Sequence, residues 1–464
     1  MSDHHHVSLE DLPPDGEKFD VTRIAGPLKV LFAVGVVGVV ASVGMLVFGV
    51  KAMAYSWLFA IAFFYTITMG GLFWVLLHNA SNSGWGVAVR RVMEHLANMV
   101  PVMFVLSLPF LLPNVQNALW EWMAEHRAVE HAIHAVQEGN VTEEIAAHHH
   151  GVVEAAKANP GLTLQEGLEA DHKALLAKKY GYVNMTFWLI RFFAFFFFLW
   201  FGAYMLRKFS VSQDHGAGIK ATFSARRFAC GWLPLFAVSL TFTWLDWLMG
   251  LNYKWFSTMW GVYLFAGSAW SSMAVLILTV TWLRSQGYLQ RVVTDEHFHL
   301  MGKLLFAFTV FWAYIAFSQF FLIWYANITE ETEFFILRNS GGWNLVSILG
   351  LLFGHFAIPF LALLHVWVKK SPRYITAVCV WILAMHMIDL YWIVIPERGP
   401  SLTGGRCSPS RDIPLRHLGL RLGRRYFPLV VSAQPEPLQP LSVPRSPLDR
   451  IDQPAQLINL AEST

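Results

Sequence analysis

Four ionisable residues inside long apolar stretches are the side chains of this chain best suited to chemistry. His386 and Asp389 lie three residues apart in one stretch, so they share a face of any helix that forms there. A carboxylate beside an imidazole can accept and release protons near neutral pH. The alternative role for such a pair is interhelical hydrogen bonding that fixes helix packing. We favour proton transfer.

Asp246 and Arg191 form the second candidate pair. Asp246 follows Ser239 and Thr243 at helical spacing, so the three form one polar stripe. Arg191 lies at a comparable depth in another apolar stretch, and an Arg191–Asp246 pair would satisfy two charges that are costly in a membrane. The pair therefore either transfers protons, as a counterpart of the His386–Asp389 pair, or is a purely structural ion pair.

Further polar residues in the apolar stretches are candidates for a quinone or proton pathway. They are Glu94, His95, His299, Lys303, Tyr314, Ser318, Gln319 and His355. The first four lie near the predicted inner surface, where they could form the mouths of proton channels. Solvation at the membrane surface is the simpler explanation for Lys303, and helix packing is the simpler explanation for Tyr314 and Gln319.

The elements that must position these residues are transmembrane helices. Of the 464 residues, 55% are hydrophobic and only 14% are charged, whereas soluble domains carry roughly a quarter charged residues. Backbone groups in lipid must be satisfied within the segment, so apolar runs long enough to cross the hydrocarbon layer are helices. We expect an all-α integral membrane protein with about nine such helices, at 28–50, 55–77, 95–112, 184–206, 228–250, 258–283, 300–325, 343–368 and 373–395.

The distribution of basic residues predicts the orientation of these helices. With a cytoplasmic N-terminus, the short outer loops hold only Lys51, Lys254 and Arg338, and the inner loops hold the many remaining loop lysines and arginines. The long Glu-rich loop 113–183 then lies outside, and we expect helices over the membrane surface there. Its histidines lack the spacing of a metal site, so we expect a solvated surface at His126, His131, His134, His148, His149, His150 and His172.

A weak internal repeat of polar residues predicts two four-helix bundles. The expected organisation is a cytoplasmic tail (1–26), a peripheral transmembrane helix (27–54), a first bundle with the long outer loop (55–254) and a second bundle (255–398). Residues 399–464 are rich in Pro and Arg and violate the charge bias. This segment is either a shifted reading frame that replaced a tenth helix or a genuine tail.

Composition excludes several functional classes. The three cysteines form no CxxC or CxxCH spacing, so we expect neither covalent haem c nor an iron–sulfur cluster on this chain. The formal net charge of +3 is too small to indicate a nucleic-acid partner. No resident metal or other cofactor is predicted.

Four long motifs resemble a known family. They are 55–80 (YSWLFAIAFFYTITMGGLFWVLLHNA), 244–267 (WLDWLMGLNYKWFSTMWGVYLFAG), 301–332 (MGKLLFAFTVFWAYIAFSQFFLIWYANITEET) and 386–397 (HMIDLYWIVIPE). They resemble the ActF subunits of alternative complex III, a bacterial quinol:cytochrome c oxidoreductase. ActF subunits in turn resemble the NrfD-type membrane subunits of molybdopterin oxidoreductases. The similarity covers about residues 20–405, and the chain departs from it after Gly405.

The resemblance implies ten helices, eight of them in two four-helix bundles. It further implies a multi-pass subunit of the bacterial inner membrane that contacts quinone or quinol and supplies proton routes. Partner subunits would carry haem c and iron–sulfur clusters, and a terminal oxidase could follow them.

Two other classes stay open at this point. A haem b cytochrome would need facing histidines, but His355 and His365 differ in direction by about 80° on one helix. A proton-coupled transporter would show helix-breaking residues at matched positions of the two halves, and the prolines within the spans do not pair in this way.

Overall fold

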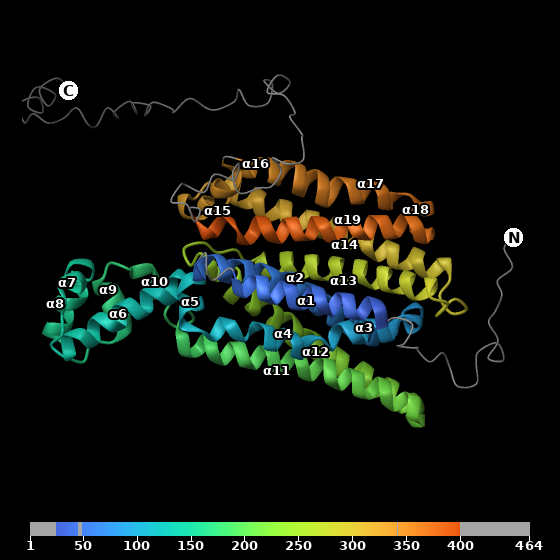
Figure 1. Ribbon diagram of the computed structural model, residues 1–464, viewed down its shortest axis with the longest axis horizontal. Helices are drawn as coiled ribbons and strands as arrows, with labels where there is room; N and C mark the ends of the chain where they lie inside the picture. Colours follow the sequence, from blue (N-terminus) through green and yellow to red (C-terminus); the bar gives the residue numbers. More distant parts are fainter. Residues whose placement is uncertain (1–24, 45–48, 341, 400–464) are drawn as a thin grey trace, which may run out of the picture. The chain divides into compact units, whose positions relative to one another are not determined.

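The computed structural model describes residues 25–44, 49–340 and 342–399, so the N-terminal tail up to residue 24 and the segment 400–464 lie outside the described residues. Over the described ranges the chain is helical, and no strand occurs there (Figure 1). Eight helical stretches within them are long and apolar enough to cross a membrane, which confirms the expected all-α membrane fold. The ninth expected span corresponds to α1 (Ala25–Gly44), whose apolar part is shorter.

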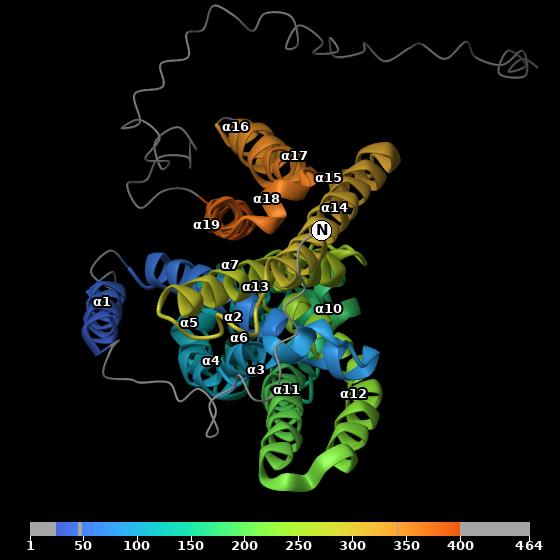
Figure 2. The same ribbon diagram turned by 90° about the vertical axis from the view of Figure 1, so that its right-hand side faces the viewer.

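The helices of the first half pack around α2 (Val50–Ser81). The other members are α3 (Arg90–Ala97), α4 (Val100–Ser107), α11 (Met185–Ser212) and α12 (Gly218–Trp247). The second half contains α13 (Trp260–Ser285), α14 (Asp295–Ala326), α15 (Thr329–Asn339), α16 (Trp343–Leu345), η8 (Val346–Ala357), α17 (Ile358–Leu364), α18 (Val366–Lys370) and α19 (Pro372–Val394). Figure 2 shows α11 and α12 on one side of α2 and α13, with α16–α19 on the other.

Two glycines of α2 allow close helix packing, Gly70 against the second half and Gly71 within the first. A Cβ at Gly70 would lie 2.0 Å from the carbonyl oxygen of Ser268 in α13, and a Cβ at Gly71 would lie 2.7 Å from the Cβ of Leu96 in α3. Any side chain at these positions would force the helices apart. Small residues at such crossings allow close packing, which is the main attraction between helices in lipid.

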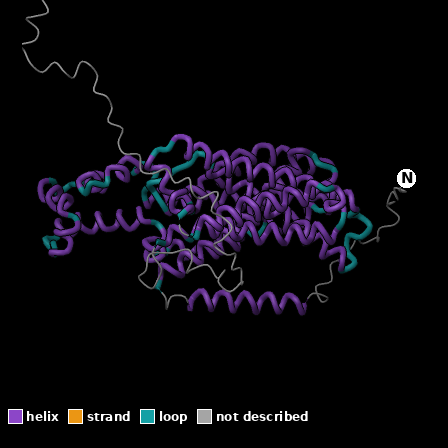
Figure 3. The backbone as a smooth tube through the Cα atoms, turned by 90° about the horizontal axis from the view of Figure 1, so that it is seen from above, coloured by secondary structure: helices purple, strands orange, loops and turns teal. Residues whose placement is uncertain are grey.

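Two of the expected spans are not continuous α-helices. The span expected at 95–112 begins with α3 at Arg90 and breaks before α4, where Pro101 lacks a backbone N–H to continue the helix. The span expected at 343–368 is mostly the π-helix η8, and it ends at Leu364 because the backbone of His365 is extended. Figure 3 shows the described part of the chain as helices joined by loops.

The long loop is helical, as expected. It forms α5 (Pro113–Leu119), α6 (Glu121–Gln137), α7 (Glu143–His148), α8 (His150–Ala158), α9 (Leu164–Ala170) and α10 (Ala174–Lys179). The expectation that all its histidines are solvated is wrong for two of them. His126 is buried between the rings of Trp122 and Tyr180, because α6 packs on α8 and α9. The Nδ1 atom of His149 lies 3.0 Å from Asp171.

His126 gives this helical region a predictable response to acid. Burial lowers its pKa from 6.5 to about 4, so between these values the unfolded region binds more protons than the folded one. We expect the amides of α6–α10 to exchange hydrogen faster at pH 5 than at pH 7, after correction for intrinsic rates. His126→Phe should remove this pH dependence, with the amides of α11 as the internal reference. If the variant shows the same acid response, His126 is not its cause.

Candidate functional site

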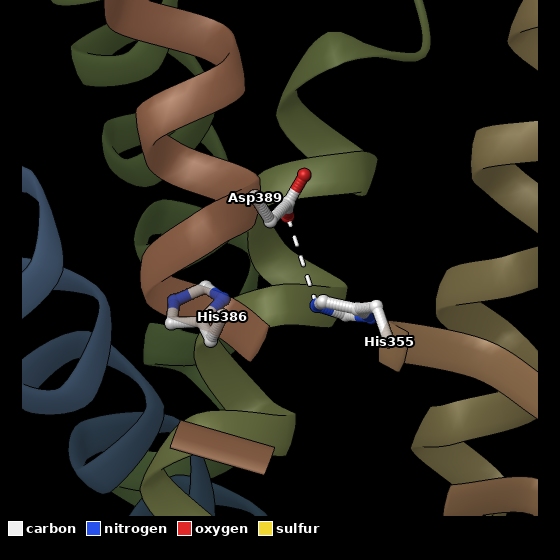
Figure 4. Close-up of side chains that lie close together, drawn as sticks. All are labelled: His355, His386 and Asp389. Carbon is white, nitrogen blue, oxygen red and sulfur yellow. Dashed lines mark ion pairs between the residues drawn. The ribbon is translucent and has the colours of Figure 1, made fainter. Parts of the chain in front are cut away.

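The second half buries a cluster of three ionisable side chains. His386 and Asp389 project from α19 and His355 from η8 into the same space (Figure 4). Their exposed fractions are 0%, 1% and 1%. The Nε2 atom of His355 lies 3.8 Å from Oδ2 of Asp389. The predicted pair on α19 therefore has a third member, His355, which was predicted only as a separate pathway residue.

Hydroxyl groups from neighbouring helices complete the cluster. The phenol of Tyr263 in α13 donates a hydrogen bond to Oδ1 of Asp389. The Oγ1 atom of Thr66 in α2 lies 2.9 Å from Nε2 of His386, so the first half of the chain also contacts the cluster. A Cβ at Gly267 would lie 3.0 Å from Cε1 of His386, and this glycine leaves room for the imidazole ring.

Two tryptophans fix the position of His355. Its ring centroid lies 3.7 Å from that of Trp312 and 4.2 Å from that of Trp270. The indole N–H of Trp270 donates to Thr309 at 2.8 Å. Neither nitrogen of His355, nor Nδ1 of His386, has a hydrogen-bond partner among the described residues. A buried imidazole nitrogen without a protein partner calls for an explanation, such as a catalytic role or a bound water or ion.

Asp246 in the first half has a different environment. Arg191 donates to it from Nε and from Nη2, both at 2.8 Å, as the sequence predicted for this pair. The hydroxyl of Tyr182 also donates to it at 2.9 Å, and the Arg191 guanidinium lies 3.9 Å from the centre of the Tyr182 ring. Burial next to Asp246 raises the pKa of Tyr182, which keeps the phenol protonated as a donor. Ser239 and Thr243 are buried on the same face of α12.

The two aspartates therefore differ in one respect that decides their chemistry. Asp246 accepts two charge-assisted hydrogen bonds from one guanidinium, which balances its charge. Asp389 has a phenol and an imidazole beside it, and no Lys or Arg in the described part of the chain pairs with it. A buried carboxylate without a cation can lose its charge only by taking up a proton. Asp389 is thus the better proton acceptor.

The candidates near the predicted inner surface do not join the cluster. Glu94 is buried among Arg90, Arg91 and Arg207, with Arg207 at 2.7 Å, so its charge is balanced within the protein, and its place at the mouth of a proton channel stays a prediction. His95 points to the exposed side of the same helix. On α14, Lys303 is exposed and His299 is half-buried.

The remaining candidates on α14 point in different directions. Tyr314 is 64% exposed and Gln319 is buried, and both line an apolar cavity beside the cluster. Ser318 is half-buried and does not line it. Tyr263, Thr66 and Tyr182 were not predicted as site residues. A hydroxyl in an apolar stretch was the only signal for Tyr263 and Thr66, and that signal is common in membrane helices.

The three side chains of the cluster are of types that ligate metal ions and haem iron. The ligand atoms of His355, His386 and Asp389 lie within 4.8 Å of one another, which is close enough for a metal. No fourth His, Cys, Asp or Glu from the described ranges joins them, so the set lacks the four protein ligands of a structural zinc site but has the three that catalytic zinc sites use. A porphyrin at His355 would have to displace Trp270 or Trp312, and His365 is exposed beyond the end of α17.

Breaking the Arg191–Asp246 pair should destabilise the protein. Arg191→Leu leaves a buried carboxylate without its cation, and we expect the free energy of unfolding in detergent to fall by about 3–5 kcal/mol. The double variant Arg191→Leu/Asp246→Leu removes both charges and should recover most of this loss. Denaturant titration of the three proteins measures both effects. A single variant within about 1 kcal/mol of the wild type would show that the pair is not structural.

Comparisons with known proteins do not show which family the chain belongs to. No protein-family model matches the chain, and no curated protein matches it. The likeness to ActF subunits therefore rests on the four motifs quoted above, and the function of the site has to be argued from its side chains.

Proposed function

We propose that the chain is a membrane subunit of a respiratory quinol:cytochrome c oxidoreductase, in which Asp389 and its neighbours accept protons released by quinol oxidation. The observation that carries this proposal is the environment of Asp389. It is 1% exposed, it accepts a hydrogen bond from Tyr263, and it faces His355 without a cation among the described residues.

The chemistry of quinol oxidation gives such a carboxylate a purpose. Each quinol oxidised releases two electrons and two protons. The electrons would pass to haem and iron–sulfur centres of partner subunits, and the protons need an acceptor within the membrane. Asp389 would take the first proton through the Tyr263 hydroxyl and pass it to His355, and the carboxylate set free in this way would then take the second proton. This chain would then supply acid–base groups and no redox centre.

The predicted topology places this cluster near the outer surface. Asp389 lies in the last turns of α19, and Tyr263 lies in the first turn of α13. With a cytoplasmic N-terminus, both of these helix ends face outward, so protons accepted there would be released outside. The resemblance to ActF supports a bacterial inner-membrane location and partner subunits of the alternative complex III type, with a terminal oxidase as a further partner.

Asp389→Asn tests the proposal directly. The amide keeps the size and polarity of the side chain but cannot accept the proton, so we expect quinol:cytochrome c turnover of the assembled complex to fall by about 100-fold or more. Tyr263→Phe should give a smaller loss because the carboxylate remains. Turnover and proton release per electron are measured on complexes with unchanged subunit content.

Asp295→Asn is the matched control for this experiment. Asp295 is an exposed carboxylate at the start of α14, in the same half of the chain. Its ion-pair partner is Arg284, at 3.7 Å, and neither residue belongs to the cluster. This variant should turn over like the wild type. If assembled Asp389→Asn does so as well, with the same number of protons released, Asp389 has no part in the mechanism.

A further inference from the structure

The spacing of the side chains in the cluster of His355, His386 and Asp389 suits a metal ion better than a hydrogen bond. Nε2 of His355 lies 3.8 Å from Oδ2 of Asp389, which is too far for a hydrogen bond. Ligand atoms around a tetrahedral Zn²⁺ lie about 3.4 Å apart, because each is about 2.0–2.2 Å from the ion. One ligand atom from each of the three residues lies within 4.8 Å of the other two. Side-chain shifts of about 1 Å would therefore bring all three onto one ion.

The hydrogen bonds of Thr66 leave His386 with a free lone pair. The Thr66 hydroxyl has one hydrogen, which it donates to the carbonyl oxygen of Phe63 at 2.7 Å. Its oxygen must therefore accept the 2.9 Å hydrogen bond from His386, so the proton of the neutral imidazole lies on Nε2. Nδ1 then carries an unshared lone pair, and it is buried without a hydrogen-bond partner among the described residues. A bound cation would satisfy this lone pair.

Each of the three side chains is held by a neighbour, as the ligands of metal ions usually are. Thr66 holds the ring of His386, and Tyr263 donates to Asp389. The ring of His355 is stacked between two tryptophans. Both nitrogens of this ring lack a hydrogen-bond partner in the described ranges, so the ring can turn a lone pair to an ion without losing a hydrogen bond.

The types of ligand atom select an ion of the zinc class. Mg²⁺ and Ca²⁺ prefer oxygen ligands, and Cu⁺ prefers thiolates, whereas this set has two imidazoles and one carboxylate. Non-haem Fe²⁺ sites use the same three ligands but keep positions open for oxygen and substrate. The cluster is closed, with exposed fractions of 0–1%, so four-coordinate Zn²⁺ fits it best. Hydroxide in the fourth position would cancel the remaining positive charge.

We propose that His355, Nδ1 of His386 and Asp389 bind one Zn²⁺ ion. The site goes beyond the proposed function and does not depend on it. One consequence does rest on that function: an ion on Asp389 would occupy the carboxylate that takes up protons, so Zn²⁺ would inhibit the subunit. The ion would enter at the end of α19, because Asp389 lies in the last turns of this helix and helix ends open most readily.

Titration of the full chain with Co²⁺ in detergent tests the site. Co²⁺ takes the same ligands as Zn²⁺ and absorbs visible light strongly when it is four-coordinate. The chain is purified without an added polyhistidine tag and treated with a chelator beforehand. We expect an absorption band that saturates at about one Co²⁺ per chain and disappears when Zn²⁺ is added. Co²⁺ on surface histidines keeps its water ligands, is six-coordinate and absorbs only weakly.

Four variants assign the band to the cluster. Asp389→Asn removes the charged ligand, and His386→Gln removes the Nδ1 lone pair but keeps an N–H donor for Thr66. Each should weaken Co²⁺ binding by about 100-fold or more, and Thr66→Val, which frees the imidazole ring, should weaken it about tenfold. His149→Gln is the matched control, because His149 contacts Asp171 in the outer helical region and is not part of the cluster. This variant should bind Co²⁺ like the wild type.

The outcomes separate the metal site from the proposed function. The site is overturned if the wild-type chain gives no saturable band, or if Asp389→Asn and His386→Gln both bind Co²⁺ like the wild type. If His386→Gln does not fold, Asp389→Asn alone decides. Zn²⁺ is also added to the assembled complex during quinol:cytochrome c turnover. Saturable binding with unchanged turnover would leave the metal site standing and would contradict the role of Asp389 as proton acceptor.

Discussion

A carboxylate between lipid-embedded helices needs either a cation or a proton, and the arrangement of this protein follows from that requirement. Two aspartates lie near the ends of α12 and α19. Each accepts a hydrogen bond from a tyrosine, Tyr182 in one case and Tyr263 in the other. Within the described ranges, an arginine pairs with Asp246 and none pairs with Asp389. The two halves of the chain thus contain similar polar sites, of which one is fixed by its ion pair and the other is free to change its charge.

Close packing of α2 makes the second site possible. Gly70 lets α2 approach α13, and four residues earlier on α2 Thr66 reaches His386. The cluster therefore draws on both halves, although its acid and both imidazoles belong to the second half. Helix contacts of this kind gain little from the hydrophobic effect in lipid, so the fit of small residues determines where the polar groups meet.

Much of the fold could be predicted from the sequence, because long apolar runs in a membrane protein leave helices as the only option. The His386–Asp389 and Arg191–Asp246 pairs were also predictable, since helical spacing and depth in the membrane are visible in a single chain. The contacts of Tyr263 and Thr66 were not, because they join helices far apart in sequence. The ion pairs of Glu94 were also visible in the sequence, because Arg90 and Arg91 lie four and three residues before it.

The π-helix η8 has a consequence for comparing this chain with others. Its turns contain more residues than α-helical turns, because its hydrogen bonds join residues five apart. Ser347, Ile348, Leu351, Leu352 and Phe356 of η8 line the cavity, and His355 of the same helix reaches Asp389. A homologue with an ordinary α-helix here would need fewer residues for the same two surfaces. Its alignment to this chain would then show a gap inside a membrane span, a position where gaps are normally read as errors.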